Sequence, residues 1–342
     1  MAQTAESIVE KALECGYESC GIIGIDAMAG FAEKLQERIE KAPGNDAMYS
    51  RFTRFADLRD NYPWAKSLVV CIISYRDYIL PEHLEGLIGK HYLVDMRSSE
   101  SCKEYKGSVA FEDYLRSIGL KVETDRRFGV TAMRWAAMKA GLGIVRKNNF
   151  FYTDSGSWVH IEAFLTDGEM ELIQAPAGEP CPEGCELCLD ACPTKSLSQP
   201  YTMSPAICVS PLTSREGDLI SNPDAKLMGR WIYGCDVCQD ACPHNAGKWR
   251  PREVFPGLAE LAEAISLEKI VQMDEGRLAD LLASKFFYIN RERIWQWKLN
   301  ALNAMNNDYD ESYAATIKAA KRDPNERVRH MASWVAEHNG LV

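Results

Sequence analysis

The sequence lacks the features that mark several large classes of protein. Its first residues, MAQTAESIVEKALECG, hold no basic leader and no apolar signal segment, so we expect a cytoplasmic protein in a reducing compartment. The longest apolar run, SLVVCIISY, is far shorter than the roughly 20 residues that cross a bilayer, and no membrane span is expected. Low-complexity segments are also missing from the 342 residues, of which 46% are apolar, as in an ordinary globular protein.

Neither of two common nucleotide-binding fingerprints is present. No G-x-G-x-x-G follows the first predicted strand and no G-x4-G-K-[ST] occurs, so a standard NAD site is not expected. Positive charge is also scarce, because 39 Lys and Arg face 49 Asp and Glu for a net charge of -10. A nucleic-acid ligand favours a basic surface, because cationic side chains neutralise its phosphates. The charge balance therefore argues against a protein built mainly to bind nucleic acid.

Cysteine, by contrast, is plentiful, with 12 residues in the chain. In a reducing compartment these predict metal ligation rather than a disulfide framework. Four are scattered and are expected to be small buried side chains: Cys15, Cys20, Cys71 and Cys102. The other eight fall between Cys181 and Cys242, which makes this stretch the expected centre of the chemistry.

The clustered cysteines repeat the spacing C-x2-C-x3-C-P in CELCLDACP and again in CDVCQDACP. In bacterial ferredoxins this run ends in a cysteine that ligates the other of two clusters. The repeat therefore predicts two 4Fe-4S clusters, and Cys181 and Cys208 complete the eight ligands. We assign one cluster to Cys181, Cys185, Cys188 and Cys242, and the other to Cys192, Cys208, Cys235 and Cys238.

A pair of zinc sites is the alternative interpretation of these cysteines. Zinc ribbons usually separate their C-x2-C pairs by about a dozen residues or more, whereas here a third thiol follows closely and a proline comes next. Iron–sulfur clusters are therefore favoured. One irregularity is the spacing of Cys181 and Cys185, which have three residues between them in CPEGC where the ferredoxin pattern has two.

Upstream of the cysteines, strands and helices alternate and predict an α/β domain over residues 1–170. Expected strands are SCGIIGID, SLVVCIISY, KVETD and HIEAFLTD, and expected helices lie at the N-terminus and near residues 31–39, 108–118 and 131–140. Residues 171–255 are expected to form a ferredoxin-like double-cluster domain. Helical periodicity after residue 256 predicts a module similar to HEAT repeats, whose last helix is capped by Asp323 with Glu326 and ends before Gly340.

This order of parts, with the phrase YGCDVCQDACPHN, resembles the epoxyqueuosine reductase family, corrinoid and iron–sulfur enzymes of tRNA queuosine synthesis. Residues 133–167 are similar to the family's stretch with A-G-L-G, K-N and G-S-W. The resemblance implies a nitroreductase-like first domain, related to reductive dehalogenases, that binds cobalamin beside the clusters. The cofactor-binding residues that it implies are Arg134, Gly141, Gly143, Lys147, Asn148, Ser157 and Trp158.

Several of these residues also have structural interpretations. Gly141 suits a helix end, Trp158 suits a core, and Lys147 and Asn148 suit a surface. A lone histidine such as His91 or His160 is more often structural than a cobalt ligand.

The proton donor departs from the family pattern. Family members place an Asp seven residues before the Arg that corresponds to Arg134, and here that position is Arg127. Asp125 takes the acid's place only if the loop shifts by two residues; otherwise it merely ends a strand. Arg127 cannot donate a proton at neutral pH but can hold an anion, so we expect a divergent member that reduces another compound.

The expected function is that of an oxidoreductase. Reduced ferredoxin or flavodoxin would supply electrons, and the two clusters would pass them to a corrinoid that reduces the substrate. The alternatives are a small-molecule corrinoid reductase similar to reductive dehalogenases and a corrinoid-free electron-transfer protein. We expect a monomer, with tRNA as one candidate substrate.

Overall fold

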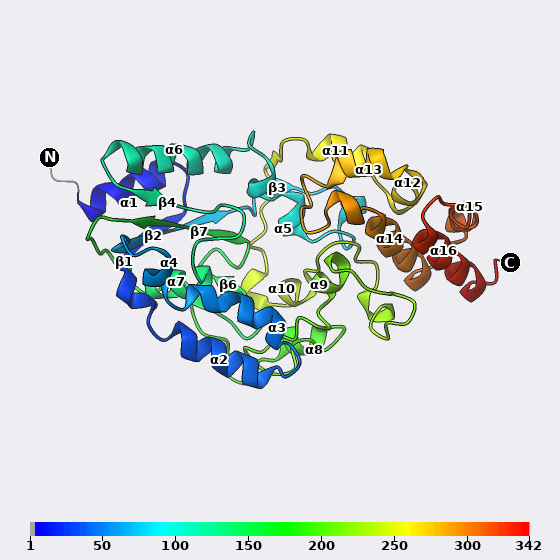
Figure 1. Ribbon diagram of the computed structural model, residues 1–342, viewed down its shortest axis with the longest axis horizontal. Helices are drawn as coiled ribbons and strands as arrows, with labels where there is room; N and C mark the ends of the chain where they lie inside the picture. Colours follow the sequence, from blue (N-terminus) through cyan, green and yellow to red (C-terminus); the bar gives the residue numbers. More distant parts are fainter. Residues whose placement is uncertain (1–3, 342) are drawn as a thin grey trace.

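The computed structural model describes residues 4–341 and shows an elongated molecule whose N-terminal and C-terminal parts lie at opposite ends (Figure 1). A sheet with its helices forms one end, the cysteine-bearing segments lie in the middle, and a group of helices forms the other end. Within residues 4–341, no helix combines the length and the apolar composition that a membrane crossing requires.

A four-stranded sheet in the order β1-β2-β7-β4 organises the first end of this mixed α/β fold. Its strands are β1 (Ser19–Gly24), β2 (Ser67–Ser74), β4 (Val122–Glu123) and β7 (Val159–Thr166), and each neighbouring pair is antiparallel. The strands expected from the sequence are therefore present. Side chains along a strand point alternately to the two faces, and strand β2 is apolar on both, so both faces of the sheet carry a layer of helices.

Helices α1 (Ala5–Glu14) and α6 (Lys103–Ser117) cover one face of the sheet, and α7 (Met133–Lys139) covers the other (Figure 1). Val69 and Cys71 pack toward α1 and α6, while Leu68 and Val70 pack toward α7. Further helices of this half are α2 (Phe31–Lys41), α3 (Asp46–Tyr49), α4 (Leu58–Asn61) and α5 (Lys90–Leu93).

The segment of residues 75–98 leaves the sheet and joins the rest of the molecule. Strand β3 (Tyr78–Ile79) pairs in parallel with β8 (Glu253–Val254), and Ile88 forms an isolated bridge with Tyr233. The middle also holds β5 (Ile144–Val145), β6 (Phe151–Tyr152), α8 (Leu187–Ala191), α9 (Val209–Ser214) and α10 (Val237–Asp240). The expected domain boundaries at residues 170 and 255 stay predictions, and these pairings cross the first of them.

The C-terminal end is helical, as the periodicity predicted. Its elements are α11 (Leu258–Ala264), α12 (Leu267–Gln272), α13 (Glu275–Leu282), α14 (Trp295–Asn307), α15 (Ala314–Ala320) and α16 (Glu326–His338). The predicted cap of α16 was wrong, because Asn325 and not Asp323 accepts the hydrogen bond of the first turn. Asp323 is instead buried, and its carboxylate lies 2.6 Å from the ammonium group of Lys298 on α14. This tertiary ion pair engages the side chain that was expected to cap the helix.

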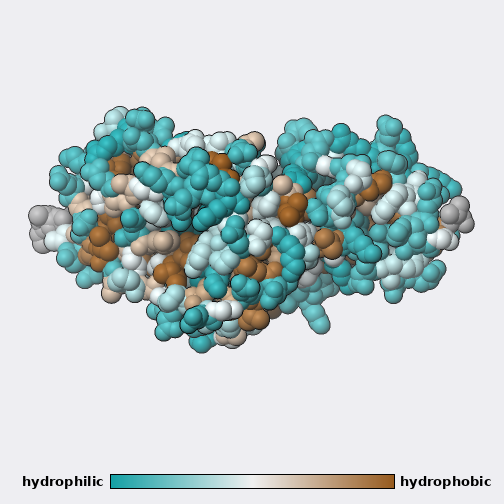
Figure 2. All heavy atoms as spheres, turned by 90° about the horizontal axis from the view of Figure 1, so that it is seen from below, coloured by the Kyte–Doolittle hydropathy of each residue, from teal (hydrophilic) through white to brown (hydrophobic). Residues whose placement is uncertain are grey.

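The molecular surface carries no single continuous apolar face in the view of Figure 2. Apolar residues form separate patches among hydrophilic ones on this side of the molecule. The features that distinguish the molecule lie instead in the middle, where the cysteines gather.

Candidate metal centre

Each cysteine motif forms a turn followed by a short helix and a proline. Cys188 lies on α8 and Cys192 follows the helix with an extended backbone conformation, after which Pro193 turns the chain. Cys238 on α10 and Cys242 after it repeat the arrangement. Because the last cysteine of each motif lies beyond its helix, it projects away from the cysteines that precede it.

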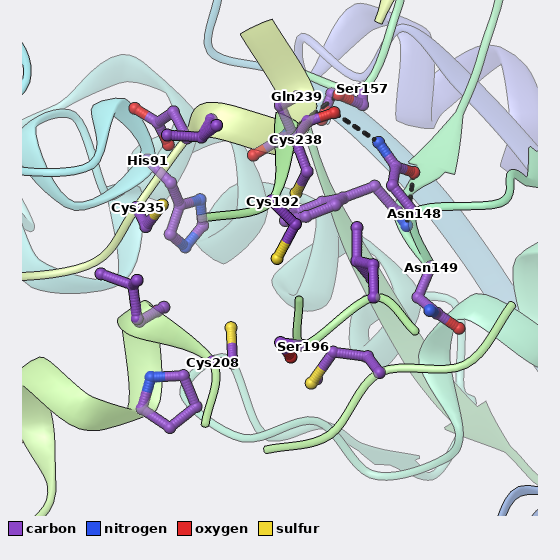
Figure 3. Close-up of a pocket in the computed structure, with 18 of the residues that line it drawn as sticks. His91, Asn148, Asn149, Ser157, Cys192, Ser196, Cys208, Cys235, Cys238 and Gln239 are labelled. Atoms are coloured by element: carbon purple, nitrogen blue, oxygen red, sulfur yellow. Dashed lines mark hydrogen bonds between the residues drawn. The ribbon is translucent and has the colours of Figure 1, made fainter. Parts of the chain in front are cut away.

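The structure gathers the eight cysteines into two groups of four. A narrow space is lined by the first quartet, Cys181, Cys185, Cys188 and Cys242. A separate cavity of about 380 Å³ is lined by the second quartet, Cys192, Cys208, Cys235 and Cys238 (Figure 3). Each quartet thus combines cysteines of both motifs, in the grouping that the sequence suggested, and cluster ligation itself stays a prediction.

The chemistry of both quartets suits a soft metal centre. Four thiols converge in each, and thiolates are the ligands that iron–sulfur clusters use. Burial raises the pKa of Cys188 to about 11 and raises the pKa of Cys235 and Cys238 further. Without a metal these side chains are therefore protonated, and metal binding must release protons.

The larger cavity extends beyond its cysteines. Tyr75, His91 and Tyr92 line it from one direction, and Arg134, Asn148 and Asn149 line it from another. Asn149 has a left-handed backbone with φ 65°, and neither atom of its side-chain amide has a hydrogen-bond partner among residues 4–341. A buried amide without a partner is costly, so the cavity fits a ligand with polar groups at its edge.

Several expected cofactor-binding residues hold the cysteine loops in place. Lys147 donates a hydrogen bond to the carbonyl of Cys185 at 2.7 Å, and Asn148 donates one to the carbonyl of Cys238 at 3.0 Å. Ser157 accepts hydrogen bonds from Gln239 and Asn245, both at 2.8 Å. Lys147 lies at the first quartet, Ser157 lines the larger cavity, and Asn148 lines both spaces.

Three expected cofactor-binding residues have structural contacts instead. Gly141 and Gly143 approach the backbone of their own chain, where an added Cβ would lie 2.1 Å from the carbonyl oxygen of Gln174 and 2.2 Å from that of Tyr152. Trp158 is buried against Tyr75 and Trp249. None of the three lines either cysteine-bordered space, and their part in cofactor binding stays a prediction.

Asp125 and Arg127 border a different hollow, of about 100 Å³, which His160 also lines. The carboxylate of Asp125 accepts hydrogen bonds from the backbone N–H groups of Arg127 at 2.9 Å and Phe128 at 3.0 Å. The guanidinium of Arg127 lies 4.6 Å from the ring centre of Phe287. Both side chains are exposed, and Asp125 follows β4 by two residues rather than ending it.

A cluster of polar side chains lies between the larger cavity and this hollow. Asp95 is buried and lies 3.7 Å from His91 and 3.6 Å from His160. This arrangement has the composition of a metal site, but Arg97 fills it: its guanidinium lies 2.7 Å from Asp95 and 2.9 Å from His91. A cation therefore already neutralises the carboxylate. Burial opposes ionisation, yet His91 and Arg97 lower the pKa of Asp95 well below its usual range.

The sequence predicted the cysteines but not most of the other residues that line the larger cavity or lie behind it. His91 was judged a lone histidine, and the structure pairs it with His160, their ring centres 4.3 Å apart. Asn149 could have been noticed as the second Asn of the K-N-N run. Tyr75, Asp95 and Arg97 carried no local signal.

The comparisons with known proteins agree with this geometry. Residues 181–245 match a family described as "4Fe-4S double cluster binding domain". An epoxyqueuosine reductase of Prochlorococcus marinus is 25% identical over 322 residues, which cover 86% of this chain and 95% of that protein. That of Escherichia coli K12 is 31% identical over 215 residues, which cover 59% of this chain and 52% of that protein.

Solved structures of epoxyqueuosine reductases share the fold. One, in complex with an epoxyqueuosine-modified tRNA stem loop, has a TM-score of 0.77 at 22% identity and covers 98% of this chain and 90% of its own. Another, from Bacillus subtilis with its catalytic aspartate loop swung out of the active site, has a TM-score of 0.76 at 24% identity and covers 97% and 89%. The chain is therefore a relative of the epoxyqueuosine reductases, which are oxidoreductases, and it contains a 4Fe-4S double cluster binding domain.

Proposed function

We propose that the chain is an iron–sulfur and cobalamin-dependent reductase that removes the epoxide oxygen of epoxyqueuosine in tRNA. The observation that carries this proposal is the larger cavity, where one cysteine quartet borders a space that also exposes unpartnered polar groups. A pure electron carrier has no need of such a space. Removal of an epoxide oxygen as water consumes two electrons and two protons, so the site must deliver both.

The two quartets would hold two 4Fe-4S clusters with different tasks. Exposed residues flank the first quartet, among them Glu183 and Leu187, so this cluster is the one that a reduced ferredoxin or flavodoxin would reach. The second cluster, beside the larger cavity, would pass single electrons inward. Bound cobalamin would supply the low-potential reduction of the substrate.

The chain's own residues would hold the corrinoid and the substrate. Arg134, Asn148, Asn149 and Ser157 line the larger cavity and offer donors and acceptors for the amide groups at the edge of a corrinoid. Asp125 is the candidate proton donor, because it lines the hollow beside His160 and because a relative's catalytic loop carries an aspartate. The proposed enzyme is a cytoplasmic monomer with a nitroreductase-like first domain and a HEAT-like C-terminal module.

A second candidate is the reduction of a smaller anionic compound. It is favoured by Arg127, which occupies the position of the family's acid, and by the net charge of -10, which is unfavourable for a tRNA ligand. In this case the chain is the divergent member that the sequence suggested. Arg127 would then leave the ring of Phe287 to hold the anion.

Anaerobic turnover tests the proposal. The reconstituted protein, with cobalamin and a strong reductant, is incubated with an RNA stem loop that carries epoxyqueuosine, and the nucleosides are measured by mass spectrometry. Conversion to queuosine that depends on both iron and cobalamin supports the proposal. Tight cobalamin binding without conversion would instead support the second candidate, and no cobalamin binding would favour a corrinoid-free electron carrier.

A further inference from the structure

We propose that Arg97 fixes His91 in the neutral tautomer that carries its proton on Nδ1, and that this N–H donates a hydrogen bond to the oxygen atom that the reduction removes. The first half depends only on the contacts of the polar cluster behind the cavity. The second half rests on the proposed function, because it names the oxygen of that reaction's substrate.

Hydrogen bonding fixes the tautomer. Nη2 of Arg97 lies 2.9 Å from Nε2 of His91, and a guanidinium has donors but no acceptor. Nε2 must therefore be the unprotonated acceptor, which leaves the proton of the neutral ring on Nδ1. Nη2 also binds the carboxylate of Asp95 at 2.7 Å, Nε lies 2.8 Å from the same carboxylate, and Nη1 donates to the carbonyl of Arg127 at 2.9 Å. With all three nitrogens engaged, the guanidinium cannot turn away.

The remaining nitrogen of His91 is left for a ligand. Nδ1 makes no hydrogen bond among residues 4–341, and the side chain is partly exposed where it lines the larger cavity. Figure 3 shows the ring pointing toward the space that Cys235 and Cys208 also border. Tyr75 and Tyr92 pack edge-to-face with the imidazole. The Tyr92 hydroxyl pairs with that of Ser210, and neither tyrosine forms a hydrogen bond with Nδ1 among residues 4–341. The cavity therefore receives one N–H donor in a fixed direction.

The surroundings keep this donor neutral. Burial lowers the pKa of His91 to about 4. The Asp95 carboxylate acts in the opposite direction, and the Arg97 guanidinium lowers the pKa further. The ring therefore carries no charge near pH 7. A neutral imidazole is too weak an acid to give up its proton, but its N–H stabilises negative charge on an oxygen. As the C–O bond breaks and the oxygen takes up electrons, His91 would hold that oxygen while another acid protonates it to water. The electrons come from the reduced electron donor through the bound cofactors.

Nitrogen NMR on the metal-free protein tests the tautomer without any turnover. With ¹⁵N-labelled histidine, Nδ1 of His91 should show a protonated-type shift and Nε2 an unprotonated-type shift from pH 8 to about 5, since its pKa is about 4. Arg97→Gln should mix the two tautomers, because an amide can turn to accept as well as donate. A His91 that is protonated on Nε2 in the wild type would overturn the proposal.

Turnover tests the contact with the oxygen. His91→Phe should lower kcat by about 10²-fold with KM changed less than about threefold, as when a donor to a developing oxyanion is removed. His91→Gln, which restores an N–H donor, should recover part of this loss, and the exposed His330 serves as control through His330→Phe and His330→Gln. An unchanged kcat in His91→Phe would overturn the contact with the substrate oxygen. A shifted midpoint potential of the second cluster in the same variant would also overturn it, because His91 would then donate its hydrogen bond to a cluster sulfur. Wild-type protein that leaves epoxyqueuosine intact would refute the proposed function and the contact together, while the NMR result would still decide the tautomer.

Discussion

The two cysteine quartets have the same composition but different surroundings. The first borders a narrow space with exposed residues beside it, and the second borders a cavity of about 380 Å³ that Asn149, Arg134 and His91 also line. The local motif is identical in both, C-x2-C-x3-C-P. The difference therefore comes from the rest of the fold, which places a narrow space with exposed neighbours at one quartet and a larger cavity at the other.

The proposed function gives the two quartets different tasks. A cluster close to the surface can exchange electrons with a protein partner, whereas a cluster beside a cavity can exchange them with a bound small molecule.

Replacement of a single cysteine in either quartet should remove one cluster and stop turnover. The wild type should bind about eight iron and eight sulfide ions after anaerobic reconstitution, and Cys208→Ser should retain about half of them, because only one quartet loses a ligand. Cys181→Ser should do the same for the other cluster. Iron and sulfide analysis with paramagnetic resonance measures this, and zinc bound without labile sulfide would contradict the assignment of both quartets.

Next in size is the effect of Asp125, the candidate acid in the hollow that His160 also lines. Asp125→Asn should lower kcat by about 10² to 10⁴-fold if this carboxyl protonates the departing oxygen. Arg127→Ala, in the same loop, should change kcat by less than about threefold on epoxyqueuosine RNA, because its guanidinium lies on Phe287. The reverse order, with Arg127 essential and Asp125 dispensable, would favour the second candidate function.

A smaller effect is expected for the wall of the larger cavity. Asn149→Ala should weaken cobalamin binding by about tenfold, since one or two hydrogen bonds are worth about 0.5–1.5 kcal/mol each. Lys147→Ala at the first quartet is the matched control and should leave the affinity within about twofold. Absorption titrations under anaerobic conditions measure both, together with paramagnetic resonance of the Co(II) form, which should show the corrinoid without its own base on the metal. Equal losses in the two variants, or a base-on signal, would argue against the larger cavity as the corrinoid site.

The smallest effect concerns pH and the metal-free protein. Because the pKa of His91 is about 4 in the folded protein, below the roughly 6.5 of an unfolded histidine, the unfolded state binds the proton more readily between these values. Stability should therefore be unaffected by this group above about pH 6.5 and should fall as the pH drops toward about 4. In denaturant unfolding, His91→Gln should lose stability less steeply over this interval than the wild type, and parallel curves would contradict the burial of a neutral ring.

The sequence predicted the parts of the molecule that depend on neighbours along the chain. Ligand spacing, the continuous apolar run SLVVCIISY and helical periodicity after Trp295 are all local, and the structure contains the corresponding features. The residues that line the larger cavity were not predictable in this way. Tyr75 and His91 lie far from the cysteines in the sequence and come close to them only in the folded chain. The same limit explains the error at Asp323, where the distant, buried Lys298 binds the carboxylate that was expected to cap a helix.

The exchange of cysteines between the two motifs has a consequence for how the protein matures. Cys242 completes the quartet that begins at Cys181, and Cys238 completes the quartet that begins at Cys192. During synthesis, neither set of four thiols can therefore exist until nearly the whole cysteine region has left the ribosome. Strand β8 at Glu253–Val254, the partner of β3, emerges later still. Metal loading must follow translation of this region, and a nascent chain that pauses before Cys238 presents only incomplete sets of thiols to an iron–sulfur assembly factor.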